Sequence, residues 1–278
     1  MNDAHSGNWH RQVSLLSSYS IEKFSKEANR KINFGEFAEN ITIEGIELAE
    51  VGLLDRFVIG KVILEVTQIG KKCHGSNCKI YKDVGNCIMP KEGIFCRVIA
   101  GGSISKGAII EHDPKIIHFK IITLSDRASS GEYEDLSGPK IKETIEKYFK
   151  KKNRKYLIES IIIPDNSLQL KKIVLDAKNA KTDCIITTGG TGIGKRDITP
   201  DIIKPMLDKE IPGIMDFIRM KYGTEKPNSL LSRSIAGTMD NTLVYVLPGS
   251  TKAVEEYMNE ILKTMEHLIF MSNDLDVH

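Results

Sequence analysis

The strongest chemical signal in the sequence is a glycine-rich loop that carries a charge pair. Residues 187–200 read TTGGTGIGKRDITP and follow a short apolar run. Thr199 suits a helix cap and Pro200 suits the first helical turn, so the loop is expected to connect a strand to a helix. Glycines in such a turn let backbone N–H groups approach phosphate oxygens closely. The spacing is neither that of a Walker loop nor that of the dinucleotide fingerprint GxGxxG.

The charge pair inside this loop favours chemistry over an ordinary turn. A glycine-rich turn without a function is the alternative, but Arg196 and Asp197 argue against it. A carboxylate among phosphate-binding groups is costly unless it holds a cation or acts on the substrate. Asp197 is therefore a candidate for one of these two roles.

Three further loops follow apolar runs and carry polar side chains. Asp165 follows the run 161–163, the segment 125–131 (SDRASSG) follows the run 116–124, and the segment 248–251 (PGST) follows the run 243–247. In an open α/β sheet, ligands bind at the carboxyl ends of the strands. Each loop alone could be an ordinary turn, but four such loops at one sheet edge predict a binding site for a phosphorylated ligand.

An alternation of apolar strands and amphipathic helices would position these loops. Strands are expected at 116–124, 157–163, 183–188 and 243–247, and helices at 137–149, 168–180, 200–209, 213–222 and 252–271. Continuous apolar strands alternating with helices predict a three-layer α/β sandwich around a mostly parallel sheet.

The first part of the chain has a different pattern, with short apolar runs separated by glycines. The runs at 41–46, 57–60, 62–67 and 94–99 predict short strands in a mainly-β, barrel-like or sandwich domain, with one helix near 20–29. The polar segment 111–115 (EHDPK) is expected to link two domains, residues 1–112 and 113–278.

Composition and charge exclude several classes of protein. The 278 residues suggest about two domains, and 39 Lys and Arg against 37 Asp and Glu leave a formal charge of +2. A nucleic-acid-binding protein would carry a basic excess, and no apolar run approaches the ~20 residues of a membrane span. The first residues lack the pattern of a signal peptide, so a cytoplasmic protein is expected.

The five cysteines fit neither a disulfide framework nor a zinc ribbon. Four of them fall at positions 73, 78, 87 and 96 without the paired CxxC spacing of a zinc ribbon. An odd number without a secretion signal also argues against disulfides. Small buried residues together with one or two functional thiols remain the open alternatives.

The polar loops of the second domain resemble those of a known family. The combination SDRASSG, GGTG, RDITP, IPGI, LSR and LPGS, across about residues 116–272, resembles the molybdopterin-binding domain of the MogA/MoaB-like molybdopterin adenylyltransferases. The resemblance implies a homotrimer or hexamer that works beside other molybdenum-cofactor biosynthesis proteins. It also implies a reaction in which molybdopterin and Mg-ATP give adenylylated molybdopterin and pyrophosphate. No nucleic-acid or membrane partner is expected.

The resemblance also assigns residues. Asp165 and Asp197 match the two essential acidic residues, which act in catalysis and on the Mg²⁺ of Mg-ATP. The pterin and nucleotide positions are Ser125, Asp126, Arg127, Thr188, Gly189, Gly190, Thr191, Gly192, Arg196, Ser232, Pro248, Gly249 and Ser250. Many members carry Asn where this chain has Val246, and some MoaB-type members have lost the acidic residue of the central loop. Because Asp197 is kept, an active enzyme is favoured.

Residues 1–110 resemble the MOSC domain, the C-terminal domain of molybdenum cofactor sulfurase. The matching stretches are DAHSG at 3–7, HRQVSLL at 10–16, GEFAENIT at 35–42, GKKCHGSNC at 70–78 and CIMPKEGIF at 87–95. The family is barrel-like, and it is thought to handle sulfur or to bind the finished molybdenum cofactor; pyridoxal phosphate binding is a further expectation at family level. The chain starts almost on the first motif, so either the start is misassigned or the first strand of the domain is expected to be missing.

The cysteine of that family falls in the turn at residues 73–78. We assign it to Cys78, with Cys73 as the second choice, because a soft thiolate suits both sulfur and molybdenum. Cys87 and Cys96 are expected to be packing residues, and Cys184 is expected in a strand core. His5, His10 and His74 are either part of an anion or metal site or loop histidines satisfied by water or backbone.

Three hypotheses follow for the whole chain. The first is a fused enzyme whose second domain adenylylates molybdopterin. The second is a carrier or chaperone that binds molybdopterin or the finished cofactor without consuming ATP. The third is sulfur transfer through Cys78.

Overall fold

The computed structural model describes residues 10–71 and 86–275 of the chain. Contacts between Cα atoms divide the chain into two compact units, one comprising Met1–Lys115 and Leu275–His278 and the other Ile116–Asp274. These units are called the N-terminal and the C-terminal domain below, and each is described by itself.

The C-terminal domain is built on a six-stranded mixed sheet. The strand order is β10 (Lys209–Glu210), β11 (Ile235–Met239), β12 (Thr242–Leu247), β9 (Cys184–Thr188), β7 (Ile117–Leu124) and β8 (Tyr156–Ile163). The last four strands in this order run parallel, whereas β11 is antiparallel to β12 and β10 is antiparallel to β11. The predicted sheet is therefore correct for its parallel part, and the antiparallel strands are an addition at one edge.

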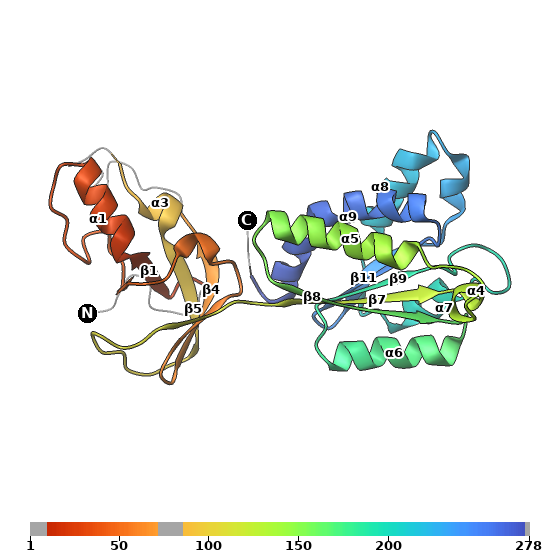
Figure 1. Ribbon diagram of the computed structural model, residues 1–278, viewed down its shortest axis with the longest axis horizontal. Coiled ribbons are helices and arrows are strands. Elements are labelled where there is room, and N and C mark those ends of the chain that lie inside the picture. Colours follow the sequence, from red (N-terminus) through yellow and green to blue (C-terminus); the bar gives the residue numbers. More distant parts are fainter. Residues whose placement is uncertain (1–9, 72–85, 276–278) are drawn as a thin grey trace. The chain divides into compact units, whose positions relative to one another are not determined.

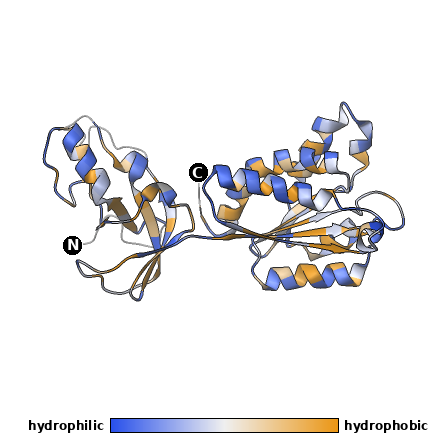
Figure 2. Ribbon diagram, viewed as in Figure 1, coloured by the Kyte–Doolittle hydropathy of each residue, from blue (hydrophilic) through white to orange (hydrophobic). Residues whose placement is uncertain are grey.

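Helices cover both faces of this sheet and make a three-layer α/β sandwich (Figure 1). One face carries α5 (Ser137–Lys151), α8 (Pro212–Gly223) and α9 (Thr251–Ser272), and the other carries α6 (Ser167–Asn179) and α7 (Thr199–Ile203). Every residue of β9 and β12 is buried, as expected for apolar strands covered on both sides. In Figure 2, hydrophobic residues are frequent in the strands, and the helices that cover them carry both hydrophobic and hydrophilic residues. Ile141, Ile145 and Phe149 of α5 are fully buried.

Within the C-terminal domain, one predicted helix is shorter than expected, and two strands, β10 and β11, were not predicted. The helix expected at 200–209 ends at Ile203, because Pro205 lacks an amide hydrogen and disfavours a helical residue before it. A 3-10 turn, Lys204–Met206, precedes β10. β11 contains Gly237, whose added Cβ would lie 2.5 Å from the carbonyl oxygen of Lys209 in β10. A glycine inside a strand weakens the sequence pattern, and here it allows the two backbones to approach.

The N-terminal domain is mainly β, as predicted. Its sheet has the order β2 (Ile41–Ile43), β1 (Val13–Ser17), β5 (Ile94–Ala100), β4 (Val62–Ile69), β3 (Arg56–Ile59) and β6 (Glu111–Asp113). All neighbours are antiparallel except β1 and β2. Helix α1 (Ser18–Glu27) packs against the sheet through Ile21 and Phe24, and a short helix, α3 (Met89–Glu92), precedes β5. Closure of this sheet into a barrel stays a prediction, because the described strands form a sheet that begins with β2 and ends with β6.

The segment expected as a linker begins with a strand. β6 pairs with β3, and the Nε2 atom of His112 lies 2.9 Å from the Oδ2 atom of buried Asp55. The other oxygen of Asp55 accepts a hydrogen bond of 3.0 Å from the Lys115 amide. The polar segment 111–115 is thus held on the N-terminal domain by its backbone and by one buried carboxylate.

Candidate active site

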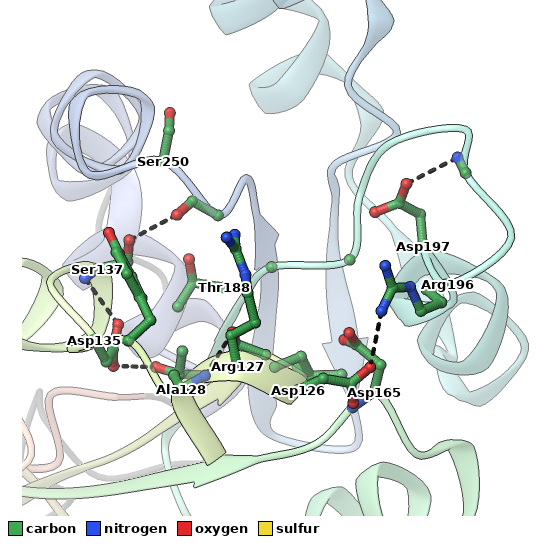
Figure 3. A pocket seen from close by; sticks show the side chains of 18 of the residues that line it. Asp126, Arg127, Ala128, Asp135, Ser137, Asp165, Thr188, Arg196, Asp197 and Ser250 are labelled. Carbon is green, nitrogen blue, oxygen red and sulfur yellow. Dashed lines mark hydrogen bonds and ion pairs between the residues drawn. The ribbon is translucent and has the colours of Figure 1, made fainter. Parts of the chain in front are cut away.

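A cavity of about 780 Å³ lies at the carboxyl ends of β7, β8, β9 and β12 in the C-terminal domain (Figure 3). The predicted residues that line it are Ser125, Asp126, Arg127, Asp165, Thr188, Gly189, Gly190, Arg196, Asp197, Gly249 and Ser250. Residues from all four predicted loops therefore meet at one place. This follows from parallel strands, whose carboxyl ends share one edge of the sheet.

The loop after β7 is tied to the loop after β8. Ser125 caps the short helix α4 (Asp126–Ser129), because its Oγ atom accepts a hydrogen bond of 3.1 Å from the Ala128 amide. The Oδ1 atom of Asp126 accepts a hydrogen bond of 2.9 Å from the amide of Asp165, and its Oδ2 atom lies 3.5 Å from Nη1 of Arg196. Asp126 therefore connects three of the loops and carries charge into the cavity.

The glycine-rich loop folds back tightly on the sheet edge. Gly189 has a φ of +101°, and an added Cβ would lie 2.3 Å from the carbonyl oxygen of Leu124. Its amide donates to the carbonyl of Leu247 at 3.1 Å, and its carbonyl accepts from Oγ1 of Thr199 at 2.9 Å. Only glycine fits this turn, because both the backbone angle and the space exclude a side chain.

Asp197 lies near the C-terminal end of the same loop and is hydrogen-bonded to the loop backbone. Its Oδ2 atom accepts a hydrogen bond of 2.8 Å from the amide of Gly194. Arg233 holds the outer backbone of the loop: its Nε atom donates to the carbonyl of Gly192 at 2.8 Å, and its Nη2 atom donates to the carbonyl of Asp197. Its Nη1 atom also pairs with both oxygens of Asp201, at 2.7 and 2.9 Å. Arg233 was not among the predicted residues, although it directly follows Ser232 in the LSR motif.

We expect Arg233→Lys to loosen this loop. A lysine ammonium keeps the charge but cannot reproduce the planar fork that contacts Gly192, Asp197 and Asp201 together. The free energy of unfolding should fall by about 1–3 kcal/mol, which thermal unfolding measures. Arg233→Ala should cost at least as much, and a lysine variant with wild-type stability would contradict the assignment.

The second acidic residue, Asp165, is held in a partly buried and negatively charged environment. Burial raises the pKa of its carboxyl group, and the charges of Asp126 and Asp197 raise it further. A hydrogen bond to the backbone of Asp126 and the charge of Arg196 oppose this shift. Its ionised form therefore costs stability in the folded protein. A cation delivered by a ligand would relieve this cost.

We expect Asp165→Asn to melt at a higher temperature than the wild type at neutral pH. A raised carboxyl pKa in the folded state means that the cost is present above this pKa and disappears once the pH falls below the unfolded value. The difference in melting temperature should therefore shrink to zero in acid, which thermal unfolding across a pH series would show. Asp240→Asn is the control: Asp240 is an exposed carboxylate in the turn between β11 and β12 and pairs with Lys178 at 2.8 Å, so its neutralisation should not raise the melting temperature. Equal melting temperatures of wild type and Asp165→Asn at neutral pH would contradict this account.

The carboxylates fit a metal ion that arrives with a ligand. Over residues 10–71 and 86–275, no group of three or more His, Cys, Asp or Glu side chains is arranged as a metal site. Mg²⁺ commonly binds one or two carboxylates and takes its other oxygens from phosphates and water. Asp165 and Asp197 could supply such carboxylates.

Four predicted residues, Thr191, Gly192, Ser232 and Pro248, do not line the cavity. The amide of Arg233 donates to the carbonyl of Thr191 at 3.0 Å, and the carbonyl of Gly192 accepts from the Arg233 side chain. The carbonyl of Pro248 accepts from Oγ1 of Thr188 at 2.7 Å, and Ser232 pairs with Ser234. Their roles in binding stay predictions.

Other lining residues were missing from the sequence prediction. Tyr133, Asp135, Ser137 and Lys195 line the cavity, and the guanidinium of Arg127 lies 5.6 Å from the centre of the Tyr133 ring. A signal was present in the sequence: Asp135 stands two residues before Ser137 at the start of a helix, which is a capping arrangement.

The thiols and histidines of the N-terminal domain are placed only in part. Cys73, Cys78, His5 and His74 lie outside the described residues. Cys96 and Cys184 are buried, as predicted, and burial raises the pKa of both thiols. Cys87 is half-buried next to the cluster around Phe24. The Nε2 atom of His10 lies 3.3 Å from Oε1 of Gln68, so this histidine has a protein partner.

Two family models match the chain. Residues 120–267 match the model described as a probable molybdopterin binding domain, and residues 2–111 match the MOSC domain. In the part of the chain that is described, no helix has the length and apolar character needed to cross a membrane.

Individual proteins resemble the C-terminal domain. The molybdopterin adenylyltransferase of Helicobacter pylori is 33% identical over 153 residues, which cover 55% of this chain and 86% of that protein. Gephyrin of Dictyostelium discoideum is 35% identical over 159 residues, but these cover 55% of this chain and only 22% of gephyrin. The crystal structure of the tungsten cofactor synthesizing protein MoaB from Pyrococcus furiosus has a TM-score of 0.50 at 33% identity, covering 57% of this chain and 98% of that one.

Proposed function

We propose, from the premise that the chain belongs to the family of probable molybdopterin binding domains, that its C-terminal domain adenylylates molybdopterin. In this reaction the phosphate of molybdopterin attacks the α-phosphorus of ATP, and pyrophosphate leaves. The name of the Helicobacter pylori relative supports the proposal. The observation that carries it is that Asp165, Asp197 and the Gly189–Gly190 turn line one cavity.

The residues of this chain would act mainly by positioning and by balancing charge. The reactants of adenylyl transfer are highly charged, and the protein takes little part in the covalent chemistry. Asp165 and Asp197 would hold the Mg²⁺ that enters with ATP. Arg127, Lys195 and Arg196 would offset phosphate charge at the wall of the cavity.

The departure at Val246 leaves the cavity intact. Val246 is fully buried and belongs to the core on the face of the sheet that packs against α6 and α7. An apolar side chain there removes no polar group from the cavity. An active enzyme is therefore favoured over a carrier that only binds molybdopterin.

An adenylylation assay tests this proposal. The wild-type protein, given molybdopterin and Mg-ATP, should form the AMP adduct of molybdopterin and release pyrophosphate. Tight molybdopterin binding without ATP consumption would instead support the carrier function.

We also propose that the C-terminal domain forms the homotrimer or hexamer implied by its family. Exposed apolar side chains on α8 and on the following 3-10 turn (Pro227–Leu231) support self-association: Phe217, Met220, Leu230 and Leu231 are each more than half exposed. Such a patch is typical of an interface. Sedimentation of the wild-type chain would reveal its assembly.

For the N-terminal domain we propose handling of sulfur or of the finished cofactor, on the strength of the MOSC match. Burial of Cys96 leaves it unsuited to this task. We propose Cys78 as the thiol, with Cys73 as the second choice. Mass spectrometry that finds neither persulfide nor cofactor adduct on Cys78 after incubation with a donor of sulfane sulfur would count against the assignment.

A further inference from the structure

The two sides of the cavity differ in chemistry (Figure 3). Asp197 and Arg196 lie on one side, with Asp126 and Asp165 next to them, and these charged groups form the carboxylate side. Ser137, Thr188 and Ser250 lie across from them and form the hydroxyl side. One carboxylate, Asp135, stands on the hydroxyl side, and the proposed chemistry gives it no role.

Both oxygens of Asp135 accept hydrogen bonds from donors in its own domain. Its Oδ2 atom accepts a hydrogen bond of 2.7 Å from Oγ1 of Thr123 in β7. Its Oδ1 atom accepts from the amides of Ser137 and Gly138, at 2.9 and 3.2 Å, at the start of α5. The carboxylate thus joins the end of a central strand to the first turn of a helix.

Ser137 extends this connection to the loop after β12. Its Oγ atom donates to the carbonyl of Gly249 at 2.8 Å. Gly249 in turn packs on the glycine-rich turn, since an added Cβ there would lie 3.3 Å from the Cα atom of Gly189. A continuous set of contacts therefore runs from Asp135 through Ser137 and Gly249 to Gly189.

We propose that Asp135 is a positioning residue of the active site, which acts through Ser137 to hold the β12–α9 loop against the Gly189 turn. The inference rests on the proposed function, because it concerns how the same cavity is kept in shape for its ligand. Gly189, Gly249 and Ser250 all line the cavity. A displacement of about 1 Å in a group that positions a substrate costs on the order of 100-fold in rate.

This role does not need the negative charge of Asp135. All three donors are neutral groups, and Asp135 is not among the charges that shift the pKa of Asp165. An asparagine could accept both amide hydrogens with its carbonyl oxygen and donate to the Thr123 hydroxyl with its amino group. Asparagine should therefore rescue the function here, whereas it should not at Asp197.

The test compares Asp135→Asn, Asp135→Ala, Ser137→Ala and the double alanine variant. The readouts are kcat and KM for molybdopterin at saturating Mg-ATP, the Kd for molybdopterin, and the melting temperature. We expect Asp135→Ala to lower kcat/KM by about 10- to 100-fold, Asp135→Asn to recover most of this loss, and the double variant to be no worse than Asp135→Ala alone. Contacts in one network give such non-additive effects.

Three results would overturn the inference. These are an asparagine variant as damaged as the alanine variant, effects of the two alanine substitutions that multiply, and a fall in melting temperature with unchanged kcat/KM. If Asp135→Ala does not fold, Ser137→Ala still carries the test, since the carboxylate contacts to β7 and α5 remain. If the wild type binds molybdopterin but does not adenylylate it, the proposed function fails, and the Kd ratios of the same variants decide the role of Asp135.

Discussion

Replacing Asp197 with asparagine should lower the rate of adenylyl-molybdopterin formation by about 100-fold or more, with molybdopterin binding close to that of the wild type. The substitution removes the charge that would hold the Mg²⁺ of Mg-ATP and stabilise the transferred phosphate. It leaves the loop in place, because the asparagine oxygen can still accept the hydrogen bond from the Gly194 amide. The Arg233 contact goes to the backbone carbonyl of residue 197 and does not depend on the side chain.

Asp240→Asn is the matched control for this experiment. Asp240 is an exposed aspartate in the turn before β12, and the cavity lies beyond the other end of that strand. The control should adenylylate at the wild-type rate. Full activity of Asp197→Asn would refute a catalytic role for Asp197, and a matching loss of molybdopterin binding would show that the residue shapes the pterin site instead.

Gly189→Ala should damage both the fold and the site. The new Cβ would meet the Leu124 carbonyl at 2.3 Å, and the residue would also have to keep a φ of +101°. We expect a loss of about 2–4 kcal/mol in the free energy of unfolding, a fall of roughly 5–15 °C in melting temperature, and weaker molybdopterin binding. Calorimetry and equilibrium binding measure the two effects.

Gly107→Ala is the control that measures the cost of a positive φ without a steric clash. Gly107 also has a positive φ, of +83°, but nothing lies within 4 Å of an added Cβ. This control should lose only about 1–2 kcal/mol and should bind molybdopterin normally. Equal losses for the two variants would mean that the contact of Gly189 with Leu124 is unimportant.

The parallel strands of the C-terminal domain and the meeting of the loops that follow them were predictable from the sequence. Apolar runs at 116–124 and 183–188 gave the central strands, and the residues after such runs, among them Asp165 and Asp197, were placed at one sheet edge. This prediction succeeds because it uses only local patterns and the rule that parallel strands end at one edge.

Residues whose role depends on distant contacts were not predictable in this way. Ser137 and Gly249 are 112 positions apart in the chain, yet one hydrogen bond joins them. Asp135 reads locally as a helix cap, and only the structure shows that the same carboxylate reaches Thr123. The two-residue strand β10 is too short to have a pattern of its own.

The antiparallel strand β11 has a consequence for where active-site residues can come from. In a sheet whose strands all run one way, residues that precede a strand lie at the edge away from the ligand. β11 runs against β12, with Ile235 opposite Val246, so the beginning of β11 lies where β12 ends. Arg233, two residues before β11, is thereby brought to the ligand edge and holds the loop of Asp197. Because one strand is reversed, residues that precede a strand and residues that follow a strand both lie at this edge of the sheet.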